Sequence, residues 1–378
     1  MGVEKKWITL IGLIVLQFPY FAFTQIKSSC LLRASAHYGV ILQHRNSMGH
    51  LINGHISGAE LNIAFPSYGK NLYEIENNQP EKGVGIFWLD LANREQLGQL
   101  IAFAPFLEIP LNEQQGFWTQ HLRLGLGIGY ATRKFDPIEN HKNNVISTSF
   151  NGFVNFKFLF KHIISPKFRL DYGLSLMHAS NGKFKVPNLG INVGTFNLAV
   201  VFMNKQNNNP ISDPIRILID SSTQRKSKYE LLFGAALGIT TIYPVGSQKF
   251  LAQSYSAAIF YNKRNTHKWG MGSDVFYNPA NKINAFQEDS LTLSSFQNIQ
   301  IGFKGSWAYN IGRISLPIEM GVYVHTGYKG DGVFYHRIGV RYYFKNNLVA
   351  SFTLKAHWAR ADYFEYGFAY RLPLKVKN

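Results

Sequence analysis

The sequence predicts an all-β fold, a transmembrane antiparallel β-barrel of the outer-membrane type with about 14–16 strands. Three observations carry this prediction. Apolar and polar residues alternate with a period of two through successive segments, and no long stretch of helical period competes with them. In addition, 46% of the residues are apolar although the mean hydropathy is only −0.10. Apolar residues spread evenly along a chain are typical of alternating strands.

Residues 1–24 have the pattern of a secretory signal peptide, which the mature fold would not contain. Two lysines precede a short apolar run over residues 7–16, and small residues near position 24 offer a cleavage site. No other segment approaches the ~18 uninterrupted apolar residues of a membrane-spanning helix. The single cysteine, Cys30, excludes an internal disulfide framework.

The expected strands fall into two series, with a polar, proline-containing segment between them. The first series lies near 33–44, 55–65, 82–90, 97–109, 117–131, 146–160, 167–179 and 191–203. The second lies near 228–242, 250–261, 268–278, 296–309, 314–325, 335–344, 348–358 and 363–372. We therefore expect an N-terminal barrel unit over 25–204, a connecting loop over 205–227 and C-terminal barrel strands over 228–378.

The alternation is clear within single strands. Over 118–130, Leu122, Leu124, Leu126 and Ile128 share one face, and glycines and polar residues take the other. Strands of about ten or more residues are long for a sandwich and match a tilted membrane-spanning strand. Aromatic residues near strand ends resemble interfacial girdles: Trp118, Tyr130, Trp269, Tyr277, Trp358 and Tyr370. Lipid requires a closed sheet, so either one large barrel or two tandem eight-stranded barrels would fit.

The net charge of +17 indicates an anionic partner. Nucleic acid is a poor candidate for an exported chain, whereas a phosphate-bearing membrane surface fits better. Scattered surface lysines remain the alternative explanation. Charged residues on the inward faces, such as Arg169, Asp171 and Lys355, are expected to pair across the barrel interior. The histidines show no metal-ligand spacing, and we expect no metal or cofactor.

One strand carries a candidate catalytic pair. Over 168–176 apolar residues alternate with polar ones, and His178 and Ser180 continue the apolar face. Residues two apart on a strand point the same way, which is the spacing at which an imidazole can take a hydroxyl proton. The strand is expected to break at Asn181-Gly182, a turn signal. The pair would thus face hydrocarbon, which suits an enzyme whose substrate is a membrane lipid.

The strand order predicts on which side of the membrane the candidate site lies. If the first strand starts in the periplasm and runs outward, odd-numbered strands end at the cell surface. The seventh strand ends at the His178–Ser180 pair, so the candidate site is expected at the outer rim of the hydrocarbon layer. A site pointing to the barrel axis or lying at the periplasmic rim would end the case for lipid cleavage.

The HASNG motif at 178–182, the Pro187-Asn188 pair and the strand at 191–203 resemble the lipid A 3-O-deacylase family, also described as acyloxyacyl hydrolases. The resemblance is specific over about residues 117–204 and implies an outer-membrane barrel that hydrolyses an ester-linked acyl chain of lipid A. The implied partner is lipopolysaccharide in the outer leaflet.

Carried over to this sequence, the resemblance makes Ser180 the nucleophile and His178 its general base. Asn181, with Gly182, matches the region that binds the oxyanion, where a donor can contribute a few kcal/mol. The family's acidic residue aligns with Asn192, a neutral residue that can still orient the imidazole. Lys183 and Lys185 either contact lipid A phosphates or only solvate their loop.

The sequence therefore predicts an outer-membrane serine esterase acting on lipid A. Two alternatives stay open. One is a passive porin-like or structural barrel, and the other is an inactive relative that binds lipid A through its basic rim, which the neutral Asn192 makes plausible.

Overall fold

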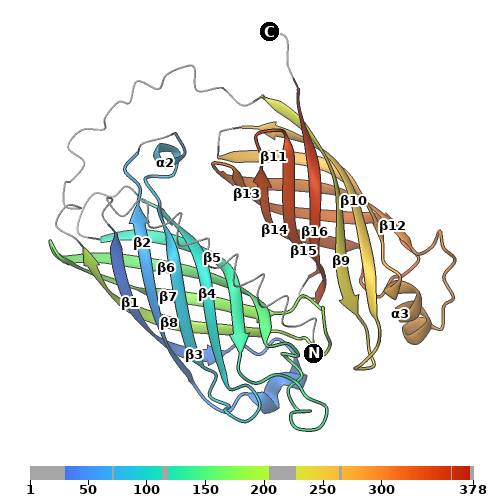
Figure 1. Cartoon of the computed structure of the whole chain (residues 1–378), viewed down its shortest axis with the longest axis horizontal. Helices are drawn as coiled ribbons and strands as arrows, with labels where there is room; N and C mark the ends of the chain where they lie inside the picture. Colours follow the sequence, from blue (N-terminus) through green and yellow to red (C-terminus); the bar gives the residue numbers. More distant parts are fainter. Residues whose placement is uncertain are drawn as a thin grey trace, which may run out of the picture.

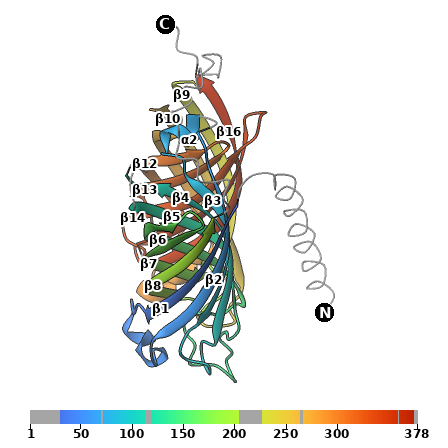
Figure 2. The same cartoon turned by 90° about the vertical axis from the view of Figure 1, so that its left-hand side faces the viewer.

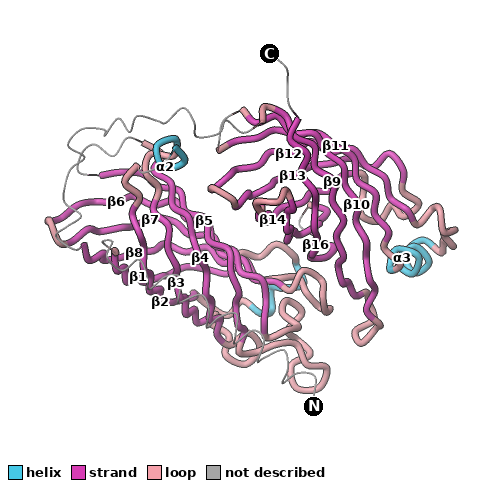
Figure 3. The backbone as a smooth tube through the Cα atoms, turned by 45° about the horizontal axis from the view of Figure 1, so that its top comes forward, coloured by secondary structure: helices cyan, strands magenta, loops and turns pink. Residues whose placement is uncertain are grey.

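The computed structural model describes residues 30–69, 72–112, 118–203, 227–263, 266–358 and 360–374. The expected signal peptide at 1–24, and all but the last residue of the expected connecting loop at 205–227, lie outside these ranges. Strands make up most of the described chain, and loops and a few short helices make up the rest (Figure 3). These are η1 (Asn46–Leu51), α2 (Leu72–Glu76) and α3 (Ala280–Asp289).

The first series of strands closes into one antiparallel barrel. Its strands are β1 (Leu31–Ile41), β2 (Ile56–Pro66), β3 (Glu81–Asp90), β4 (Gln99–Pro110), β5 (Trp118–Ala131), β6 (Phe150–Ser165), β7 (Phe168–Ser180) and β8 (Ile191–Met203). Each strand pairs with its sequence neighbour, and β1 pairs with β8 to complete the ring.

The second series closes into a separate antiparallel barrel by the pairing of β9 with β16. Its strands are β9 (Tyr229–Thr241), β10 (Lys249–Asn262), β11 (His267–Tyr277), β12 (Ile299–Ile311), β13 (Ile314–His325), β14 (Phe334–Tyr343), β15 (Leu348–His357) and β16 (Arg360–Leu374). The structure thus has two eight-stranded barrels, which lie side by side (Figures 1 and 2). The β-barrel prediction is confirmed, and of the two arrangements left open the tandem one is found.

Strand bounds differ most from expectation at β6, which was expected at 146–160 and runs from Phe150 to Ser165. Val145 and Ile146 are apolar, yet each is only 1% exposed in a cluster with Met48 and Leu51 beneath the loops. The expected strand therefore began too early, because apolar residues that belong to the preceding loop were counted as part of it.

The two faces of the sheets have opposite chemistry. Outward side chains such as Leu61, Leu174 and Met271 are 64%, 64% and 69% exposed. Exposed aromatic residues lie at strand ends, among them Trp118 and Tyr130 of β5. An outer surface of this kind is stable only in hydrocarbon with aromatic girdles at its borders.

Both interiors are filled by ion pairs. In the N-terminal barrel, Arg33 pairs with Glu108 at 3.0 Å and with Asp171 at 2.9 Å. In the C-terminal barrel, Arg337 pairs with Glu319 at 2.8 Å and with Glu365 at 2.5 Å. The expected pairing of inward charges is confirmed. Side chains fill the described part of each lumen, as an eight-stranded barrel allows.

The loops differ in length between the two ends of each barrel. At the end where β7 terminates, the chain makes long excursions over 132–149 and 278–298. The two-residue turns at 166–167 and 312–313 lie at the other end, together with the longer β2–β3 connection over 67–80. The end with the long excursions, where β7 terminates, is at the bottom of Figure 1 in both barrels. Within the described ranges, no helix has the length and apolarity to cross a membrane.

Contacts at both ends hold the barrels together. At the β7 end, the Thr241 backbone N–H donates to the Lys183 carbonyl oxygen at 3.0 Å. At the other end, the Thr266 hydroxyl donates to Glu76 of α2 at 2.9 Å. The two outer surfaces therefore face each other next to the end of β7.

Candidate functional site

Strand β7 places His178 on the outer surface of the N-terminal barrel. Leu174 and Leu176, on the same face, are 64% and 48% exposed, while Asp171 and Ser175 on the opposite face are buried in the lumen. Period-two alternation accounts for this arrangement. The imidazole therefore points away from the barrel axis.

Ser180, His178 and Asn192 form one line of hydrogen bonds. The Ser180 hydroxyl lies 2.9 Å from His178 Nε2, and His178 Nδ1 lies 2.7 Å from Asn192 Oδ1. Strand pairing explains the second contact, because His178 of β7 is directly opposite Asn192 of β8. The structure thus brings together three of the residues that the sequence singled out.

His44 extends this line and was missed by the sequence analysis. The Asn192 amide Nδ2 donates to His44 Nδ1 at 3.1 Å, and His44 Nε2 lies 3.1 Å from the Leu189 carbonyl oxygen. His44 follows β1 in the chain but meets β8 across the closure of the barrel. No local sequence signal could have found this contact.

The Leu189 carbonyl fixes the direction of every bond in the line, because a carbonyl can only accept. His44 Nε2–H must donate to it, which leaves His44 Nδ1 to accept from the Asn192 amide. Asn192 Oδ1 then faces His178 and accepts its Nδ1–H. The remaining lone pair of His178 is on Nε2, directed at the Ser180 hydroxyl. This is the tautomer that a general base requires.

The loop after β7 is built on Asn181. Its amide Nδ2 donates to Ser147 Oγ at 2.9 Å and to the Lys185 carbonyl at 3.0 Å, and its backbone N–H donates to Asn188 Oδ1 at 3.0 Å. Both amide hydrogens of Asn181 are therefore occupied within the loop. Gly182 follows with φ of +60°, which is the turn expected from the Asn-Gly pair.

Gly190 packs directly against the hydrogen-bonded pair. A Cβ at this position would lie 2.8 Å from His178 Cε1 and 3.2 Å from Ser180 Cβ, and its φ is +78°. Glycine is required here for both the close approach and the backbone conformation. A side chain at position 190 would displace the imidazole.

The two lysines of the loop lie in different surroundings. Lys183 is half-buried and lines a cavity together with His178 and Ser180. Lys185 is exposed and is not among the residues that line it. The structure therefore brings only the first lysine to the candidate site.

The cavity beside His178 has a volume of about 460 Å³ and lies between the barrels. Its far wall comes from the C-terminal barrel and includes Ile242, Leu354 and Trp358. The sequence analysis expected the pair to face hydrocarbon. Instead the second barrel covers this part of the outer surface, and Ser180 is only 6% exposed.

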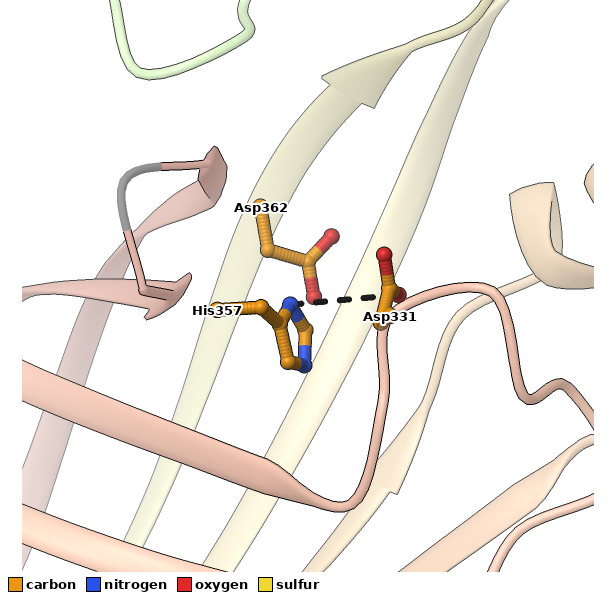
Figure 4. Close-up of side chains that lie close together, drawn as sticks. All are labelled: Asp331, His357 and Asp362. Atoms are coloured by element: carbon orange, nitrogen blue, oxygen red, sulfur yellow. Dashed lines mark ion pairs between the residues drawn. The ribbon is translucent and has the colours of Figure 1, made fainter.

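A separate cluster in the C-terminal barrel has the donors of a metal centre. One ligand atom each of Asp331, His357 and Asp362 lie within 4.8 Å of one another (Figure 4). Asp331 lies in the β13–β14 loop, where burial and the neighbouring Asp362 carboxylate raise its pKa. However, Lys355 Nζ already pairs with Asp362 at 2.6 Å, and we assign no metal to this cluster.

Two family models match the chain, one on each barrel. The model described as "Lipid A 3-O-deacylase (PagL)" matches residues 58–201. The model described as "Acyloxyacyl hydrolase, C-terminal domain" matches residues 228–375. No curated protein matches the chain.

Several solved structures are similar to parts of the chain. Neisserial surface protein A is 13% identical, and the match covers 46% of this chain and 97% of that one at a TM-score of 0.31. The outer membrane enzyme PagL is 15% identical, with 44% and 97% covered at a TM-score of 0.29. A triple mutant of the Rhodopseudomonas blastica porin is 8% identical, with 91% and 100% covered at a TM-score of 0.17.

Proposed function

Since this chain belongs to the lipid A 3-O-deacylase family of acyloxyacyl hydrolases, which are outer-membrane ester hydrolases, we propose that its Ser180 and His178 remove an ester-linked acyl chain from lipid A. The observation that carries the proposal is the line of hydrogen bonds from the Leu189 carbonyl to the Ser180 hydroxyl. It leaves the His178 lone pair directed at the nucleophile.

The reaction follows the chemistry of a serine hydrolase. His178 Nε2 takes the hydroxyl proton as Ser180 Oγ attacks the ester carbonyl carbon. Collapse of the tetrahedral intermediate breaks the bond to the sugar oxygen, which receives the proton from His178. A water molecule deprotonated by the same imidazole then hydrolyses the acyl-enzyme, which releases the fatty acid and restores Ser180. No metal or cofactor takes part.

Asn192 acts as a neutral positioning residue. Its Oδ1 holds His178 Nδ1 at 2.7 Å and thereby keeps Nε2 toward Ser180. The imidazolium formed during the reaction gains less from an amide than from the carboxylate that the family carries at this position. The site is therefore expected to turn over more slowly than one with an acidic partner.

The developing oxyanion needs donors close to Ser180. Since the amide and the backbone N–H of Asn181 are both engaged in the loop, we assign this role to the backbone N–H of Gly182. That N–H has no hydrogen-bond partner among the described residues. Asn181 then contributes by holding the turn that presents Gly182.

The site is proposed to face the outer leaflet. Outer-membrane barrels have short periplasmic turns and longer extracellular loops, and the site lies at the end with the long loops. Lipid A occupies this leaflet. Lys183 can bind its phosphates, whereas Lys185, which lies outside the cavity, can contribute only at longer range.

The test is a mass spectrum of lipid A incubated with the purified full-length chain. The wild type should remove one acyl chain, and Ser180→Ala or His178→Ala should abolish fatty acid release. Ser175→Ala is the matched control, because Ser175 lies on the same strand but faces the lumen, hydrogen-bonded to Asn197 at 3.0 Å. Wild-type release by both site variants would contradict the proposal.

A lipid A-binding relative without activity is the second candidate, favoured by the amide at position 192. Asn192→Glu distinguishes an active esterase from an inactive lipid A-binding protein. If only that variant releases fatty acid, the natural chain is a binder whose site has lost its acid. The filled lumens argue against a passive pore.

A further inference from the structure

The outer surface of the C-terminal barrel next to the site has a distinct composition. Phe364 of β16 is half-buried, whereas Tyr366 and Phe368 further along the same face are 63% and 62% exposed. The difference arises because Phe364 packs against the N-terminal barrel. A Cβ on Gly152 would lie 3.1 Å from its ring, and one on Gly182 2.4 Å.

Further contacts fix this docking. The Thr241 hydroxyl and backbone N–H both donate to the Lys183 carbonyl, at 3.1 and 3.0 Å. Lys249 Nζ of β10 lies 3.6 Å from the centre of the Phe184 ring. In the contacts with Thr241 and Lys249, the N-terminal barrel contributes residues of the loop that follows Ser180. The position of the second barrel is therefore tied to the loop that shapes the site.

The wall opposite Ser180 includes polar side chains, where contact with lipid alone would demand apolar ones. His336 of β14 lies on the outward face of its barrel between the exposed Phe334 and Ile338, and the described residues offer it no hydrogen bond. An ionisable side chain on a lipid-facing surface is costly and points to a function. His336 lines the cavity together with the exposed Arg360.

The charges around the cavity favour an anion. Its cationic lining residues are Lys183 and Arg45 from the N-terminal barrel and Arg360 from the C-terminal one, and its single anionic lining residue is Glu288 of α3. Glu288 already accepts from the Tyr328 hydroxyl at 2.7 Å. Within the described part of the chain, Arg360 makes one long hydrogen bond, at 3.5 Å, to the Gly330 carbonyl. Its guanidinium keeps donors available for a phosphate.

The apolar part of the same wall fits an acyl chain. Ile242, Leu354 and Trp358 line the cavity opposite Ser180. Its volume of about 460 Å³ lies within the range of pockets that bind small ligands. A lipid with a phosphorylated head and a hydrocarbon tail would match both parts of the wall.

We propose that the C-terminal barrel is the second wall of the lipid A-binding cleft, with Arg360 binding a phosphate of the sugar head and Trp358 packing against the acyl chain. This inference rests on the proposed function and deepens it. The second barrel thus selects the substrate, while the first barrel carries the reacting groups.

The test measures binding of lipid A to the full-length Ser180→Ala chain in detergent micelles, where hydrolysis is blocked. In that background Arg360→Gln should weaken binding of lipid A about 10-fold, and Arg360→Lys should restore part of it. Arg313→Gln is the control, because Arg313 is exposed in the turn at the opposite end of the barrel. With dephosphorylated lipid A, the effect of Arg360→Gln should disappear.

A second pair of variants tests the apolar part of the cavity wall. Trp358→Ala should weaken binding of both forms of lipid A, whereas Trp269→Ala, on the outer face of β11 and 54% exposed, should not. Electrophoretic heat-modifiability confirms that each variant forms barrels. If Arg360→Gln and Trp358→Ala bind as their controls do, the inference is wrong. If these contrasts hold but the wild type releases no fatty acid, the proposed reaction fails and the cleft assignment stands.

Discussion

Replacing Asn192 with leucine removes the acceptor of the His178 Nδ1–H and leaves a side chain of similar size on the outward face of β8. In the wild type this hydrogen bond measures 2.7 Å, and the amide that makes it is itself held by His44 at 3.1 Å. In the leucine variant the Nδ1–H has no partner on this side. The imidazole is then free to rotate or to carry its proton on Nε2, and either change stops it from accepting the Ser180 proton.

The size of the effect follows from the lost bond. Leaving a largely buried donor without a partner costs about 1–3 kcal/mol. The cost falls most heavily on the transition state, where the imidazole is cationic, so kcat should fall roughly 5- to 160-fold. The loss should appear mainly in kcat, because the lost hydrogen bond matters most when the imidazole is cationic.

The assay is fatty acid release from lipid A by purified protein, with kcat and KM determined separately. Asn192→Asp is the matched variant, because it keeps the acceptor and adds a charge that stabilises the imidazolium. Its kcat should equal or exceed that of the wild type. A leucine variant with wild-type kcat would refute the positioning role. Equal losses in both variants would show that the position needs an amide for another reason.

Three further outcomes are expected. His44→Phe should lower kcat about 10-fold, because Asn192 loses the partner that keeps its amide oriented. An unchanged kcat would remove His44 from the line of hydrogen bonds. Gly152→Leu should impair lipid A binding, because the leucine would collide with the Phe364 ring, and adding Phe364→Ala should restore part of the binding. Gly305→Leu is the control and should have no effect, because nothing lies within 4 Å of a Cβ at that position. No rescue in the double variant would argue against docked barrels. Glu319→Gln leaves three buried cations without their shared anion and should destabilise the C-terminal barrel by about 3–5 kcal/mol, seen as a lower heat-modification temperature.

The candidate site shows which contacts local sequence can predict. His178 and Ser180 are two residues apart on one strand, so alternation alone places them on the same outward face. Asn192 follows from pairing the adjacent strands β7 and β8 in register. His44 and Gly190 could not be found in this way, because their positions depend on the closure of the barrel and on the fold of the loop.

The amino-acid sequence by itself determined the barrel strands and the outward direction of the His178–Ser180 pair, since both follow from a period of two along single strands. Only the tertiary structure decided that the strands close as two rings. It alone also packed Phe364 of the second ring against Gly152 and Gly182 and placed Arg360 and Trp358 in the lining of the cavity beside Ser180. Ring closure and docking depend on contacts between residues far apart in the chain, and periodicity carries no information about these.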